Sequence, residues 1–149
     1  MTNIRKSRGY AYESMFVGRL QKRGWHAFRL GGTQIHLPDV LAIHHGQKHA
    51  AVFELKTGAA SVLYVKAHQI RRLNEWQSVL RQYRTATVLA FRFHTAGRTR
   101  DTREYMYTVG DALDYKCDYD GNLQFRIGKT WVMAPRLAWT HSGAVQVDI

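Results

Sequence analysis

Two short apolar runs carry acidic residues at matching places, and this pairing constrains the fold more than any other feature of the chain. The runs are HLPDVLAIHH (36–45) and HAAVFELK (49–56), and they predict two strands joined by a turn at Gly46-Gln47. A turn centred there pairs residues whose numbers sum to 93, so Asp39 lies directly opposite Glu54. The predicted hairpin therefore brings two carboxylates together.

Two carboxylates in this register need a physical reason, because like charges opposite one another destabilise a sheet. A bound divalent cation supplies that reason. Glu54 and Lys56 share one face of the strand, since side chains alternate with period two. Two carboxylates and an ammonium in one patch suit the hydrolysis of a phosphodiester by a metal-bound water.

The alternative is an ordinary salt bridge, Asp39–Lys56 or Glu54–Lys56, at the edge of a sheet. The neighbouring residues weigh against it, because buried charges are rare unless they are paired or bound to a metal. Both strands are rich in apolar side chains, which predicts that they are buried: Val40, Leu41, Ile43, Val52, Phe53 and Leu55. We therefore favour the metal site.

The composition indicates an anionic polymer as partner. The chain has 149 residues, which fits one domain, and a formal net charge of +11 with a pI near 10.2. Arginine outnumbers lysine by 15 to 7, and arginine favours bidentate phosphate contacts. Nucleic acid is favoured over a membrane surface, because no long basic amphipathic helix is evident. A basic protein without such a partner is the plain alternative.

The expected location is intracellular, in the cytoplasm or at the nucleoid, with a viral gene as a further source. No stretch is long and apolar enough to span a membrane, and MTNIRKSRGYAYE lacks the apolar core of a signal peptide. The single Cys117 cannot form an internal disulfide, so a reducing compartment fits. A small packed side chain is its simplest role.

The rest of the chain predicts an α/β domain with one mixed sheet. Residues 1–7 are expected to form a basic arm, in which Arg5 and Lys6, with Arg8 beside it, contact DNA. The predicted elements are a helix over 8–23 stopped by Gly24, a strand over 25–30, a loop over 57–61, a helix over 65–83, a strand over 87–93, a basic loop over 94–104, and strand-like runs at 105–109 and 123–127 around a turn at 120–122.

Glu13 borders the apolar face of the first predicted helix, because it precedes Phe16 by three residues and Leu20 by seven. An acidic residue early in a helix is ordinarily explained by the helix dipole. The carboxylate patch predicted nearby makes Glu13 a further site candidate.

Four histidines surround the predicted hairpin: His36, His44, His45 and His49. A zinc site is conceivable, but neither HExxH nor a Cys/His framework is present. Solvent exposure near the turn explains His44, His45 and His49, while His36 stays a minor candidate for the carboxylate patch.

The chain resembles the archaeal-type Holliday junction resolvases of the PD-(D/E)xK nuclease superfamily. The resemblance rests on five motifs in order over roughly the first half of the chain: RKSRGYAYE, GWHAFRLGGT, PDVLAIHHG, FELK and LYVKAHQIRRLNEW. It implies a restriction-endonuclease-like core, in which a central mixed β-sheet is flanked by helices. The C-terminal third has no counterpart among these motifs.

The resemblance also implies roles for individual residues. Catalytic roles fall on Glu13, Asp39, Glu54, Lys56 and Thr33, where Thr33 stands in place of the family's usual serine. The metal would be held by Asp39, Glu54 and the backbone carbonyl of Leu55, with Glu13 as a further ligand directly or through water. Arg29 would position the phosphate, and DNA contacts would also involve Tyr64, Lys66 and Gln69.

The activity implied is that of a magnesium-dependent endonuclease that resolves four-way DNA junctions as a homodimer, with Mn²⁺ expected to substitute for Mg²⁺. Two alternatives stay open. Another PD-(D/E)xK endonuclease of restriction or repair type would share the site but prefer duplex or flapped DNA. A non-catalytic junction-binding protein is disfavoured, because it gains nothing from carboxylates that repel phosphate.

Overall fold

The computed structural model describes residues 4–30, 37–94, 102–140 and 143–146, with side chains given for 9–30, 37–94 and 102–140. Two helices and eleven strands form within these ranges. They are α1 (Ile4–Lys22), β1 (His26–Arg29), β2 (Val40–His44), β3 (His49–Gly58), β4 (Val62–Val65), α2 (Ala67–Val79), β5 (Arg84–His94), β6 (Thr102–Val109), β7 (Tyr115–Asp118), β8 (Leu123–Ile127), β9 (Thr130–Met133), β10 (Leu137–Thr140) and β11 (Gly143–Gln146).

A mixed sheet of seven strands forms the centre, in the order β1-β2-β3-β5-β6-β10-β11. β3 and β5 run parallel, and the segment between them returns through β4 and α2; the other neighbours are antiparallel. The β2–β3 hairpin pairs Val40 with Phe53 and His44 with His49, which confirms the register predicted from the turn. The fold class, a central mixed sheet flanked by helices, is also confirmed.

The two helices cover opposite faces of this sheet. α1 packs Tyr12, Phe16 and Leu20 against Ala51 and Phe53 of β3 in one buried cluster. Its end is a Schellman motif, in which the Trp25 amide donates to the Leu20 carbonyl and Gly24 adopts a φ of 87°. The predicted glycine stop is therefore confirmed, and it turns the chain directly into β1.

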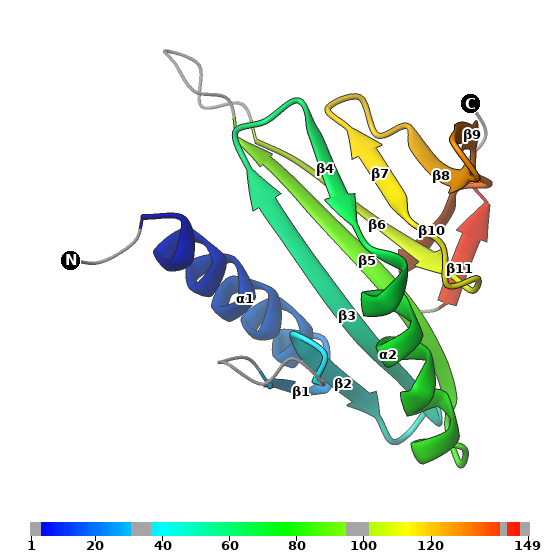
Figure 1. Ribbon diagram of the computed structural model, residues 1–149. Helices are drawn as coiled ribbons and strands as arrows, with labels where there is room; N and C mark the ends of the chain where they lie inside the picture. The colour runs from blue at the N-terminus through cyan, green and yellow to red at the C-terminus, as the bar shows by residue number, and fades with distance from the viewer. Residues whose placement is uncertain (1–3, 31–36, 95–101, 141–142, 147–149) are drawn as a thin grey trace.

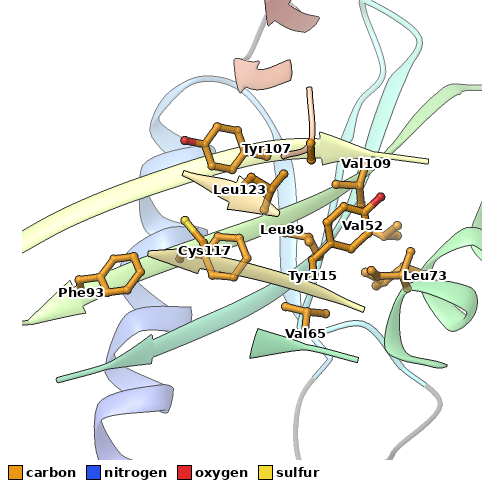
Figure 2. Close-up of a cluster of buried hydrophobic side chains, with 13 residues drawn as sticks. Val52, Val65, Leu73, Leu89, Phe93, Tyr107, Val109, Tyr115, Cys117 and Leu123 are labelled. Atoms are coloured by element: carbon orange, nitrogen blue, oxygen red, sulfur yellow. The ribbon is translucent and has the colours of Figure 1, made fainter. Parts of the chain in front are cut away.

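A second sheet, β4-β7-β8-β9, shares the other face with α2. Figure 1 shows β4, β7 and β8 in front of the long strands β5 and β6. Figure 2 shows side chains of both sheets and of α2 meeting in one core, among them Leu89, Leu73 and Leu123. Cys117 is fully buried in this core, as its predicted packing role requires.

The structure corrects several predictions about the elements: among them, the second helix ends at Val79 and not at 83, β5 starts at Arg84 and not at 87, and β3 extends to Gly58 into the predicted loop. Helix α1 begins at Ile4, so residues 4–7 are not an extended arm. Residues 62–65 form β4 before the second helix, which therefore begins at Ala67 and not at 65. The predicted basic loop is shorter, because β5 continues to His94 and β6 starts at Thr102. The second sheet is an addition to the one sheet expected, because β4 pairs with β7, about fifty residues further along the chain.

Candidate active site

Asp39 is fixed at the point where the β2–β3 ladder ends. Its amide donates to the carbonyl of Phe53 at 3.0 Å, and its carboxylate Oδ2 accepts from the amide of Leu55 at 2.8 Å. The carboxylate therefore accepts the hydrogen bond that a backbone carbonyl would accept if the β2–β3 ladder continued. The amide and carbonyl of one strand residue point the same way, so the Leu55 carbonyl faces this end of the ladder too.

Glu54 lies beside Asp39 and contacts two further residues. Its Oε1 accepts from Gln69 Nε2 at 2.9 Å and lies 3.4 Å from Lys56 Nζ. The Glu54 side chain is 12% exposed and that of Lys56 30% exposed, so a solute can reach the site while the carboxylate stays mostly out of water. The structure thus brings Asp39, Glu54 and Lys56 together as the sequence predicted.

The electrostatics of the pair favour a bound cation. Burial, followed by repulsion from Asp39, raises the pKa of Glu54 from 4.5 to about 7, although the neighbouring Lys56 ammonium lowers it. Burial also raises the pKa of Asp39, against the lowering effects of the Leu55 amide and Lys56. Burial destabilises the ionised form of both carboxyl groups, and repulsion from Asp39 adds to this effect at Glu54. A divalent cation bound between them would offset both effects.

Glu13 approaches the pair from α1. Its Oε2 lies 3.1 Å from Arg29 Nε, and its carboxylate is 13% exposed. Burial raises the pKa of Glu13, and repulsion from Asp39 adds to the effect, so the two carboxylates lie within electrostatic reach. The expectation that Glu13 borders the patch is met. Arg29 contacts Glu13, and its guanidinium carbon lies 4.8 Å from the centre of the Tyr10 ring.

The donor set fits magnesium better than zinc. Mg²⁺ prefers oxygen ligands and is usually held by one or two carboxylates together with water, which matches Asp39, Glu54 and the Leu55 carbonyl. Zinc sites use histidine and cysteine. Over the described ranges, no three His, Cys, Asp or Glu side chains are grouped closely enough to hold a metal by themselves.

Helix α2 forms one wall of the site. A cavity of about 220 Å³ opens between Asp39, Glu54 and this helix, which contributes His68, Gln69 and Arg72. Neither His68 nor Arg72 was among the site residues predicted from the sequence. Their spacing of four residues places both side chains on one face of the helix. This spacing is the sequence pattern that could have identified them as neighbours in the site.

Gln69 lies beside the carboxylates, as the family resemblance implied for its segment. Its side-chain amide bridges two parts of the site, and its predicted contact with DNA stays a prediction. Oε1 accepts from the Lys66 amide at 3.0 Å, at the start of α2, and Nε2 donates to Glu54. Gln69 thus orients a carboxylate of the site.

The remaining predicted residues fall into two groups. Tyr64 on β4 is 52% exposed and Lys66 before α2 is exposed, so both side chains are accessible to a large ligand. Thr33 and His36 lie outside the described residues, and so do the side chains of Arg5, Lys6 and Arg8, although these three lie within α1.

The histidines at the hairpin turn do not belong to the site. His44 packs edge-on against Trp25, and His45 contacts the hydroxyl of Tyr83 through Nδ1 at 3.2 Å. Both lie at the end of β2 remote from Asp39.

In the described part of the chain, no helix is long and apolar enough to cross a membrane.

Comparison with known proteins identifies a family. The profile of the archaeal Holliday junction resolvases (Hjc) matches residues 4–117, which extends the resemblance past the first half of the chain into β7. No curated protein sequence matches significantly. The crystal structure of Hjc, a Holliday junction resolvase from the archaeal hyperthermophile Archaeoglobus fulgidus, is similar in fold. It has a TM-score of 0.56 at 18% identity, over 76% of this chain and 85% of that one.

Proposed function

The chain belongs to the archaeal Holliday junction resolvase family, a family of nucleases that act on Holliday junction DNA, and we propose that it is a magnesium-dependent endonuclease that resolves four-way junctions by paired phosphodiester hydrolysis. The observation that carries this proposal is the carboxylate pair Asp39 and Glu54, which lies partly buried beside Lys56 at the end of the β2–β3 ladder. In a protein that only binds DNA, such a pair would lower the affinity for DNA, because the negative charge of the carboxylates repels phosphate.

The proposed metal site consists of Asp39, Glu54 and the carbonyl of Leu55, with Glu13 as a ligand directly or through water. Mg²⁺, or Mn²⁺ in its place, would supply an acidic bound water and charge neutralisation at the scissile phosphate. The two carboxylates would fix the position of the ion. Gln69 would hold Glu54 in the productive orientation, as outer-shell partners commonly do.

Lys56 would act at the phosphate. Its ammonium lies 3.4 Å from Glu54 and is partly exposed, so it can turn from the carboxylate toward a ligand. There it would orient the attacking water and stabilise the charge that develops in the transition state. Thr33 and Arg29 would position the phosphate. Because Arg29 pairs with Glu13, binding of phosphate would compete with this ion pair.

Substrate choice would rest on shape and charge. Contacts to the DNA backbone carry no sequence information, and a net charge of +11 supplies attraction of this kind. The basic residues near the start of α1, namely Arg5, Lys6 and Arg8, and the exposed Lys66 would contribute. A homodimer would present two sites related by a two-fold axis, which matches the symmetry of a four-way junction and the paired cuts.

The deciding experiment compares cleavage of a four-way junction with cleavage of linear duplex of equal length, with magnesium and with chelator. We expect cuts in the junction only when magnesium is present. Asp39→Asn is the control for a contaminating nuclease. Equal cleavage of duplex and junction would refute junction resolution and favour another PD-(D/E)xK endonuclease, whereas binding without cleavage under all conditions would favour an architectural protein.

A further inference from the structure

The outer face of the second sheet gathers aromatic and basic side chains. Side chains alternate along a strand, and the alternate residues Leu63, Val65, Tyr115 and Cys117 point into the core. The opposite face of the same strands therefore carries Tyr64 and Lys116, which lie directly across from each other. On β8 and β9 the same face carries Gln124, Arg126, Trp131 and Met133, with Arg126 opposite Trp131.

The aromatic residues of this face form a small platform. The rings of Tyr64 and Trp131 lie 6.1 Å apart between centroids, at an angle of 60°. Lys116 Nζ lies 4.5 Å from the centre of the Trp131 ring, and Gln124 Nε2 contacts the sulfur of Met133. Tyr64 is 52% exposed, so its ring is accessible to a ligand. Figure 1 shows that β4 leads directly into α2, the helix that lines the active site.

The charge of the platform suits a polyanion. Lys116 lies against Trp131, the exposed Arg126 is opposite Trp131 on the same face, and the exposed Lys66 and Lys129 directly follow β4 and precede β9. The acidic residues of the same strand region are engaged elsewhere. Asp118 accepts from backbone amides of the β7–β8 turn at 3.0 and 2.9 Å, and Asp114 accepts from the Ala67 amide at 2.7 Å.

We propose that this face binds an unstacked DNA strand by stacking its bases on Tyr64 and Trp131 while the cations contact its phosphates. Aromatic rings interleaved with Lys and Arg on a sheet are the usual platform for single strands, because every base presents a flat π-surface. The inference rests on the proposed function, since the unstacked strand would belong to the proposed four-way junction substrate. Trp131 lies on β9, beyond the family match that ends at residue 117, so the platform is completed by this chain's own C-terminal part.

The test measures binding of a fluorescent oligothymidine and, separately, of a four-way junction, in chelator. Trp131→Leu and Tyr64→Leu keep the apolar bulk but remove the stacking surface. We expect each to weaken oligothymidine binding by about 5- to 150-fold, since stacking contributes about 1 to 3 kcal/mol per base. Trp131→Phe should restore most of the affinity. Tyr83→Leu, at the opposite end of the molecule, is the control and should have no effect.

Several results would overturn the inference. Unchanged oligothymidine binding in both leucine variants excludes stacking at this face. Dissociation of a dimer by Trp131→Leu, seen by sedimentation, means that the rings pack against a second copy instead. Circular dichroism of each variant identifies misfolding, and if one leucine variant misfolds, the affinity of the other decides. Magnesium-dependent junction cleavage is measured in parallel: if it persists while the leucine variants bind normally, this inference fails and the proposed function stands.

Discussion

Removing the charge of Glu54 should stabilise the metal-free protein while abolishing its proposed chemistry. In Glu54→Gln the side chain keeps its shape, and its carbonyl oxygen can still accept from Gln69 Nε2. What the variant loses is a carboxylate that is buried and repelled by Asp39. The folded protein therefore no longer has to hold that charge out of water.

The magnitude follows from the pKa of Glu54, which rises from 4.5 to about 7 on folding. Each unit of pKa corresponds to about 1.4 kcal/mol, so the charged side chain lowers the free energy of unfolding by up to about 3 kcal/mol above pH 7. Because the folded pKa is the higher one, wild-type stability falls as pH rises from 4.5 to 7. Below pH 4.5 Glu54 is protonated in both states, and the variant and the wild type should be equally stable.

The assay is urea or thermal unfolding at several pH values in chelator, and then with magnesium. We expect Glu54→Gln to unfold roughly 5 to 10 °C above wild type at pH 8, with the gap closing toward pH 4.5. Magnesium should stabilise wild type and leave the variant unchanged. A variant less stable than wild type at pH 8, or a gap independent of pH, would refute the electrostatic account of this site.

Three further predictions concern individual side chains. Asp39→Asn should abolish cleavage and leave junction binding intact or tighter, by gel shift in chelator, because it removes a charge that repels phosphate; wild-type cutting rates would exclude Asp39 as a ligand. Glu13→Gln should also impair cleavage in a single-turnover assay. Normal rates would exclude Glu13 from the catalytic site and leave only its ion pair with Arg29. Gln69→Leu should raise the magnesium concentration for half-maximal cleavage by about 10- to 100-fold, with activity recovering at high magnesium. Gln77→Leu on the same helix is its control, and an equal shift there would indicate a general structural effect.

The hairpin was predictable because its determinants are local. A turn at Gly46-Gln47 and the period of two along each strand fix the pairing of Val40 with Phe53, and with it the meeting of Asp39 and Glu54. The end of α1 was predictable for the same reason, since only the backbone of Gly24 is needed for its positive φ.

The second sheet was missed because its partners are far apart in the sequence. Residues 62–65 form a strand of four residues just before a helix, and only pairing with β7 distinguishes them from the helix start. The start of α1 was missed because the charges of residues 4–7 indicated a DNA-contacting arm, although Arg and Lys are good helix formers. The role of Gln69 depends on how α2 lies against β3, which no local pattern records.

The way the carboxylates are fixed is itself informative. Asp39 and Glu54 are oriented by uncharged donors, the Leu55 amide and the Gln69 side chain, at 2.8 and 2.9 Å. Lys56 brings its positive charge only to 3.4 Å from Glu54, whereas Arg29 pairs with the outlying Glu13. An arginine held between Asp39 and Glu54 would lower both pKa values and stabilise the fold, but it would occupy the place of a divalent cation. Neutral donors hold the geometry and leave the negative charge available, which is the arrangement that the proposed metal-dependent nuclease would require.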